Sequence, residues 1–338
     1  MTTYHPPFQL DHAMLSKVAE ISEWLGRWKQ AQRDALLPRL LRSNRIRSVQ
    51  ASLAIEQNTL SLQQVTAVLD GKRVLGPPRE VQEVRNAFAA YDALPRWNPT
   101  KLDHLLEAHG LLLHGLADDA GQLRAGDVGI YRGRNLVHMV PPSSQLPRLM
   151  KQLLGWLKRT DAHPLIASSA CHYELAFIHP FSDGNGRISR LWQTLILSRW
   201  QPMLAYLPVE SVIQQRQSAY YRVLSESDAA SDCSAFVTFM LDAIADSLRE
   251  AVGAETLVKT PVKTLVKKTA EKRVERPVEM PDRILALLHA QPELTLAQAA
   301  VAIGKSTSAV ERAARKLREQ GRLRYIGPQK GGHWEVME

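Results

Sequence analysis

Twelve residues, from His179 to Arg190, constrain this chain more than any other segment. They read HPFSDGNGRISR and lie between two runs whose apolar residues recur at helical spacing. Glycine at 184 and 186 permits backbone conformations that other residues avoid, so a tight loop between two helices is expected. Backbone N–H groups converge in such a loop when it opens a helix. The segment therefore predicts an anion-binding turn at a helix N-terminus.

The side chains of this segment supply the groups that phosphate chemistry needs. Arg187 and Arg190 are three residues apart on a helix, so both can reach one polyphosphate. Asp183 offers a carboxylate for a Mg²⁺ ion that bridges phosphate oxygens. His179 precedes the loop, where it can accept a proton from an attacking hydroxyl. Phe181 is expected to anchor the loop in the core. Each residue alone has an ordinary structural explanation, but the combination predicts phosphate transfer.

The rest of the chain predicts a mainly α protein of 338 residues with more than one domain. Helical apolar spacing runs through an N-terminal region at 1–110 and a second region at 111–250. A β-leaning stretch at 129–140 interrupts the second region and predicts a small hairpin. Residues 251–280 are rich in Lys and Thr and indicate a basic linker. Residues 281–338 predict three helices and two strands, the order of a winged helix-turn-helix.

The net charge of +9 is unevenly distributed along the chain. Residues 251–338 hold 16 Lys and Arg against 10 Asp and Glu, so they carry most of the excess. The third helix predicted for residues 281–338 contributes a basic group: Arg312, Arg315, Lys316 and Arg318. This pattern favours DNA as a partner of residues 281–338. A solvated basic surface and a protein-docking domain are the alternatives.

Composition also bears on the cellular compartment. No run of about 18 apolar residues is present, so no membrane span is expected. The first residues lack the basic and apolar regions of a secretory signal. Of the two cysteines, Cys171 lies in an apolar helical pattern that is typical of a buried thiol. We therefore expect a cytoplasmic protein that has no membrane partner.

The segment from His179 to Arg190 resembles the full signature of the Fic family, His-x-Phe-x-(Asp/Glu)-Gly-Asn-Gly-Arg-x-x-Arg. The resemblance extends over nearly the whole chain. It implies a Fic-type helical domain at 111–250 with a small β-hairpin flap, and a C-terminal winged helix-turn-helix. It also implies transfer of AMP from ATP to a Tyr, Thr or Ser hydroxyl of a target protein. Self-modification and a homodimer are left open.

The same resemblance assigns roles within the signature. His179 is the general base, and Asp183 binds Mg²⁺. ATP is held through its phosphates by the remaining residues of the signature, with the last of them at the γ-phosphate: Gly184, Asn185, Gly186, Arg187 and Arg190. The second half of the glycine loop matches the nucleotidyl-transferring relatives, which disfavours phosphorylation.

Two further segments resemble parts of the family's site. The hairpin around Val137, His138 and Met139 resembles the flap on which an extended target segment adds as a strand. Tyr220 and Tyr221 resemble an aromatic pair near the adenosine, and we assign Tyr221 to that site. Core packing is the alternative for this pair.

Residues 52–60 resemble an inhibitory helix motif, (Ser/Thr)-x-x-x-Glu-(Gly/Asn), within a helix at about 48–60. The resemblance implies that Glu56, four residues after Ser52, pairs with Arg190 and competes with the γ-phosphate. Gln57 departs from the pattern, which expects Gly or Asn. A surface glutamate without a role is the ordinary alternative.

Two other functions remain open at this point. One is a nucleotide-sensing, DNA-binding transcription regulator, although such a sensor has no need of a base at His179. The other is reverse chemistry, in which Glu56 orients water to remove AMP from modified proteins.

Overall fold

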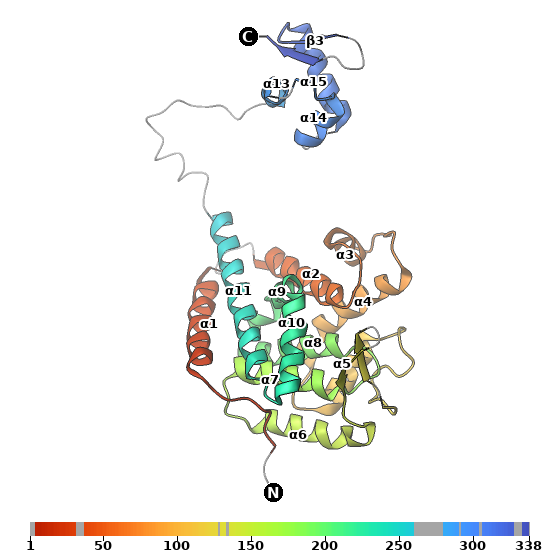
Figure 1. Cartoon of the computed structure of the whole chain (residues 1–338), viewed down its shortest axis with the longest axis vertical. Coiled ribbons are helices and arrows are strands. Elements are labelled where there is room, and N and C mark those ends of the chain that lie inside the picture. The colour runs from red at the N-terminus through yellow and green to blue at the C-terminus, as the bar shows by residue number, and fades with distance from the viewer. Residues whose placement is uncertain are drawn as a thin grey trace. The chain divides into compact units, whose positions relative to one another are not determined.

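The chain forms two compact units, Met1–Thr260 and Pro261–Glu338 (Figure 1). The computed structural model describes residues 4–31, 37–127, 129–132, 135–259, 280–290, 292–303, 306–327 and 333–337. Within these residues no helix has both the length and the apolar character needed to cross a membrane. The mainly α fold expected from the sequence is confirmed.

Helices build almost all of the first unit. Its α-helices are α1 (His12–Ala31), α2 (Leu37–Ile55), α3 (Leu62–Leu69), α4 (Pro78–Ala93), α5 (Leu102–Leu112), α6 (Leu146–Arg159), α7 (Pro164–Ile178), α8 (Asn185–Trp200), α9 (Val209–Gln215), α10 (Gln217–Ala230) and α11 (Ser234–Lys259). Among the described residues of this unit, three short 3₁₀ helices also occur: η1 (Leu94–Arg96), η2 (Ser143–Gln145) and η3 (Pro202–Tyr206).

The centre of the first unit is the pair α7 and α8, which pack against each other. Both helices are buried along most of their length, and α8 buries polar side chains such as Arg187 and Arg190 together with its apolar ones. α7 begins at Pro164, a residue that the first helical turn tolerates because its N–H would be unpaired there. The buried pair supports the loop between its two helices, which together with the start of α8 holds residues 179–190.

Other helices surround this central pair. α2 packs against α4 and α9, and α1 packs along α11 (Figure 1). The end of α2 is followed by α3, which starts at a capping box in which Ser61 and Gln64 satisfy each other's backbone N–H groups. This arrangement brings the end of α2 to α8, although the two segments are more than 100 residues apart in sequence.

Two expected boundaries differ from the structure. The division between residues 110 and 111 falls inside α5, and the first unit continues without a break. The linker expected from residue 251 starts later, because α11 continues through Lys259. Ala251 and Val252 pack against the core, which explains why the helix persists there. Residues 260–279, the rest of the expected linker, lie outside the described residues.

The expected hairpin consists of β1 (Gly129–Arg132) and β2 (Asn135–Met139), which pair antiparallel. The register shifts between Ile130 and Tyr131, where the ladder is irregular. The backbone of β2 is described, but the side chains of Val137, His138 and Met139 lie outside the described part of the chain.

The second unit has the order of elements that the sequence predicts. It contains α13 (Met280–Ala290), α14 (Leu296–Ile303), α15 (Thr307–Glu319) and the antiparallel strands β3 (Leu323–Ile326) and β4 (His333–Val336). Thr295 and Gln298 form a capping box at the start of α14. A small core includes Ile284, Ala299 and Leu317.

Candidate functional site

The glycine loop connects α7 to α8 through two residues with left-handed backbone. His179 ends α7 with φ +49°, and its N–H donates to the carbonyl of Leu175 at 3.1 Å. Gly184 precedes α8 with φ +78°. A Cβ at Gly184 would lie 2.6 Å from a methyl carbon of Leu113, so only glycine fits this turn. A positive φ is uncommon outside glycine, although histidine adopts it more often than most residues.

Asn185 holds the loop closed. Its amide Nδ2 donates to the carbonyl of Phe181 at 2.7 Å, and its Oδ1 accepts from the Phe181 N–H at 3.0 Å. The Phe181 ring is fully buried, which confirms that it anchors the loop. Because its side-chain amide is used in this way, Asn185 can contribute to a phosphate cradle only through its backbone.

His109 of α5 packs against the loop and supports it, a role that the sequence did not predict. Its ring stacks on Phe181 with 3.7 Å between centroids. The Gly121 N–H donates to Nδ1 at 2.9 Å, so Nε2 carries the proton and donates to the carbonyl of Asp183, also at 2.9 Å. Burial lowers the pKa of His109, which fits this neutral form. Nothing in the sequence distinguishes His109 from an ordinary buried histidine.

Arg190 is almost completely buried, and α2 supplies its partners. Its Nε donates to Ser52 Oγ at 3.0 Å, and its Nη2 donates to the Ser52 carbonyl at 2.9 Å and to Glu56 Oε1 at 2.8 Å. The contact expected between Glu56 and Arg190 is therefore present. Burial lowers the pKa of Arg190, but Glu56, Tyr220 and Tyr221 together outweigh burial and raise this pKa above its usual range.

The Glu56 carboxylate lies directly against the glycine loop. A Cβ on Gly186 would come within 2.2 Å of Glu56 Oε1 and 3.1 Å of Arg190 Nη1. Within the described residues, Arg190 Nη1 and Arg187 Nε are buried without a hydrogen-bond partner. Buried donors of this kind are costly unless an acceptor reaches them. A phosphate group beside Gly184 and Gly186, which have no side chains, could accept from both of these donors.

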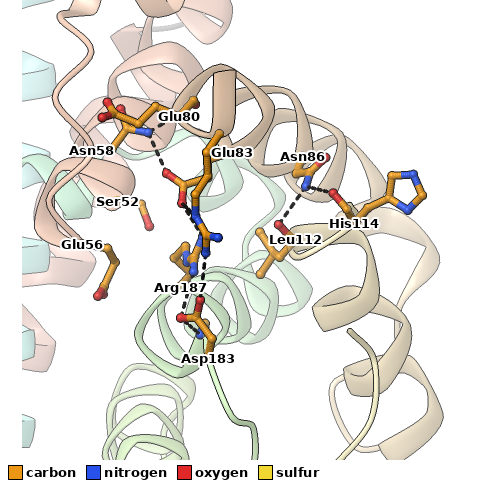
Figure 2. A network of polar contacts seen from close by, with 12 residues as sticks. Ser52, Glu56, Asn58, Glu80, Glu83, Asn86, Leu112, His114, Asp183 and Arg187 are labelled. Atoms are coloured by element: carbon orange, nitrogen blue, oxygen red, sulfur yellow. Dashed lines mark hydrogen bonds and ion pairs between the residues drawn. The ribbon is translucent and has the colours of Figure 1, made fainter. Parts of the chain in front are cut away.

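Arg187 takes part in a second polar network, drawn in Figure 2. Its Nη2 lies 3.2 Å from Asp183 Oδ1, and its Nη1 lies 3.4 Å from Glu83 Oε1 of α4. Glu83 also accepts from Asn58 Nδ2 at 2.8 Å, so α4 connects Arg187 to the turn that follows Glu56 (Figure 2). Sequence reasoning missed Glu83, because only the packing of α4 brings it to the loop.

Asp183 is the residue that could hold a cation. Its side chain is half exposed, and Arg79 lies 3.5 Å from it. Among the described residues no three His, Cys, Asp or Glu side chains gather as a metal site. A Mg²⁺ ion at Asp183 would therefore take its other ligands from phosphate and water, which is its usual preference.

The turn after α2 shows what the departure at Gln57 means. Gln57 has φ +69°, its N–H donates to the Ala54 carbonyl, and the Asn58 N–H donates to the Leu53 carbonyl. These two bonds form a Schellman motif, whose left-handed position is usually glycine or asparagine. The chain thus keeps the turn that presents Glu56, with a residue that fits this backbone less well.

Tyr220 and Tyr221, the aromatic pair expected near the adenosine, lie in different surroundings. Tyr220 is buried, and its hydroxyl lies 3.0 Å from Nε2 of His172. Tyr221 is half buried, and its hydroxyl donates to the Ile55 carbonyl at the end of α2, at 3.4 Å. Core packing therefore describes Tyr220, whereas Tyr221 lies beside the helix that carries Glu56. Burial lowers the pKa of His172 to about 3, so its ring stays neutral in the core.

Comparison with known proteins agrees with this geometry. Residues 99–197 match the model of the Fic/DOC family. The crystal structure of a Fic family protein from Desulfovibrio desulfuricans G20 is 46% identical, with a TM-score of 0.73, over 99% of this chain and 98% of that one. Protein adenylyltransferase fic-1 of Caenorhabditis elegans is 30% identical over 260 residues, 72% of this chain and 48% of that protein. This chain spans about half the length of the curated relatives it matches. It belongs to the Fic/DOC family.

Proposed function

We propose that this protein transfers AMP from ATP to a Tyr, Thr or Ser hydroxyl of a target protein and releases pyrophosphate. The observation that carries the proposal is the pairing of Glu56 with Arg190 above Gly186, where buried arginine donors lack an acceptor. A carboxylate in that position occupies the place of a phosphate. Relatives named protein adenylyltransferase, in Caenorhabditis elegans and Culex quinquefasciatus among others, support the same reaction.

The proposed reaction assigns one task to each group of residues. Arg187, Arg190 and the backbone of Gly184–Gly186 bind the phosphates. His179 accepts the proton of the target hydroxyl, whose oxygen forms a bond to the α-phosphorus. The bond from that phosphorus to the oxygen of the β-phosphate breaks, and pyrophosphate leaves. A Mg²⁺ ion at Asp183 would neutralise charge on the phosphate oxygens.

Glu56 is proposed to inhibit this reaction. Its carboxylate uses donors of Arg190 that the γ-phosphate needs, so ATP can bind productively only after Glu56 leaves. The Glu56 side chain is about one third exposed (34%), so its carboxylate can leave Arg190 and be hydrated by water instead. Inhibition would therefore be reversible rather than permanent.

The position of the label decides between AMP transfer and phosphoryl transfer. Glu56→Gly is incubated with Mg²⁺ and ATP labelled at the α- or the γ-phosphate, with and without a cell lysate. AMP transfer leaves only the α-label on protein, and adding His179→Ala to the same variant removes it. Retention of the γ-label alone would support phosphorylation, and no protein labelling would contradict the proposal.

A second proposal is removal of AMP by the same site. It rests on the partial exposure of Glu56, which lets its carboxylate reach a water molecule as well as Arg190. The test compares release of AMP from a modified protein by wild type and by Glu56→Gly. Equal release by the two proteins would exclude a role of Glu56 in this reaction.

We also propose that the second unit is a winged helix-turn-helix that binds nucleic acid. Arg312, Arg315, Lys316 and Arg318 are exposed on α15, while Ala314 on the opposite face is buried. Binding of duplex DNA by the full chain should weaken as salt rises, because the phosphates release counterions. Arg315→Ala should make the affinity for DNA less dependent on salt concentration, whereas Gln320→Ala, at an exposed uncharged residue, is the control. Binding that does not depend on salt would favour a protein-docking surface.

A further inference from the structure

One buried arginine outside the Fic signature contacts both the general base and the hairpin. Arg124 lies between α5 and β1, and its side chain has no exposed surface. Its Nε donates to the His179 carbonyl at 2.8 Å, and its backbone N–H donates to the Pro180 carbonyl at 3.0 Å. Its Nη1 donates to the Gly126 carbonyl at 2.8 Å and its Nη2 to the Pro141 carbonyl at 2.5 Å.

Core filling alone does not explain this residue. Burial lowers the pKa of Arg124, which means that the fold bears a cost for its charge. Its carboxylate neighbour, Asp127, is 3.8 Å away and mostly exposed, so it compensates only in part. An apolar side chain would fill the space at a lower cost. The planar guanidinium donates to three carbonyls from three separate nitrogens, a spread of donors that the single ammonium nitrogen of lysine lacks.

The carbonyls that Arg124 binds belong to two functional segments. One is the start of the signature, where His179 has the uncommon φ of +49°. The other is the base of the hairpin, because Gly126 precedes β1 and Pro141 follows β2. The exposed Asp127 makes a second contact across the base of the hairpin, because its Oδ1 accepts a hydrogen bond from the Ser143 N–H at 2.6 Å. Arg124 is thus the side chain that contacts both segments, whereas Asp127 closes only the hairpin.

We propose that Arg124 is a positioning residue, which fixes His179 relative to the hairpin and so to the target hydroxyl. This inference rests on the proposed function, in which His179 is the base, and on the expectation from sequence that the hairpin receives the target segment. Misplacement of reacting groups by about 1 Å can reduce a rate by about 100-fold. A residue that aligns base and target should therefore affect the chemical step, and not the binding of ATP.

The first test is Arg124→Lys in the Glu56→Gly background, with Arg148→Lys as the matched control. Arg148 is exposed on α6 and contacts Gln145 and Gln152. With ATP and Mg²⁺, pyrophosphate release by Arg124→Lys should fall about 10–100-fold. The KM for ATP should change less than about twofold, because the phosphate-binding residues are unchanged. An unchanged rate, or an equal change in rate and KM, would overturn the inference.

The second test uses amide hydrogen exchange and needs no activity. Arg124→Lys should increase exchange both at 179–183 and at 129–139. Asp127→Ala should increase exchange in the hairpin alone. Equal patterns in the two variants would overturn the inference, because the hairpin alone would then explain the effect. If Glu56→Gly releases no pyrophosphate, the proposed function fails, and the exchange pattern still decides whether Arg124 fixes both segments.

Discussion

The loop after α7 and the turn after α2 meet at Arg190, and they are held by different kinds of contact. The loop depends on buried neutral groups, namely the reciprocal bonds of Asn185 with Phe181 and the ring of His109. The turn depends on charged groups that water reaches, such as Glu56 and the Glu80 carboxylate that accepts from Thr59.

This difference makes the loop after α7 the fixed part of the site, whereas the contacts of the turn after α2 can be replaced by water. Buried hydrogen bonds are strengthened by their low-dielectric surroundings and have no competing water. Half-exposed charged contacts are weakened by water and salt. Under the proposed function, a preformed phosphate-binding loop is therefore paired with an inhibitory turn whose contact to Arg190 can be broken. Changes in the loop should reduce activity, whereas changes in the turn should increase it.

The largest expected effect is in the loop. In the Glu56→Gly background, His179→Ala should reduce pyrophosphate release by about 10²–10⁴-fold, because the hydroxyl proton loses its acceptor. Binding of ATP, measured by calorimetry, should stay unchanged. The control is His114→Ala, whose side chain is exposed. A variant that keeps its rate would show that the base lies elsewhere.

The next largest effect is in the turn, with the opposite sign. Glu56→Gly should raise pyrophosphate release by about 10–100-fold, the equivalent of one charge-assisted hydrogen bond to Arg190. Glu56→Gln should give a smaller rise, since its amide oxygen can still accept from Arg190. Glu226→Gln is the control, because Glu226 pairs only with Arg222 on its own helix in the contacts described. An unchanged or lower rate for Glu56→Gly would contradict inhibition by Glu56.

The sequence predicts the loop well because the information is local. Glycines at 184 and 186, the carboxylate of Asp183 and two arginines at helical spacing all lie within one segment of twelve residues. The elements of the second unit are likewise predictable, since their apolar residues repeat over whole helices and strands. The pairing of Glu56 with Arg190 was predicted only from resemblance to the Fic family, because 133 residues separate them.

The supports of the site were not predictable from sequence. Glu83, His109 and Arg124 reach the loop through packing of α4, α5 and the segment before β1, and each has an unremarkable sequence context. The end of α11 was misjudged for a related reason. The Lys/Thr-rich run suggested a linker, but Val252 packs against the core and extends the helix.

The loop also predicts a dependence on pH. Because the pKa of His109 is lowered in the folded state, its stabilising contribution is complete above about pH 6.5 and is lost as pH falls through the folded pKa. The free energy of unfolding should therefore fall between about pH 6.5 and pH 5.5, because the unfolded chain takes up a proton at this position more readily than the folded protein does. His109→Gln can keep both hydrogen bonds without titrating, so its stability should fall less over this range. Parallel curves from urea unfolding would contradict the assignment of a neutral His109.

The smallest expected effect tests how well the turn is held. Gln57→Gly removes the strain of a positive φ, but it also increases the conformational entropy of the unfolded chain. The net gain in the free energy of unfolding should therefore be about 0.5 kcal/mol. Ser231→Gly is the matched control, because Ser231 also ends a helix with positive φ, at +52°. Both variants should be more stable to urea. Only Gln57→Gly should slow pyrophosphate release, by about twofold, because it favours the turn that presents Glu56. Equal slowing in both variants, or a faster rate in Gln57→Gly, would show that the backbone at Gln57 does not set the strength of inhibition.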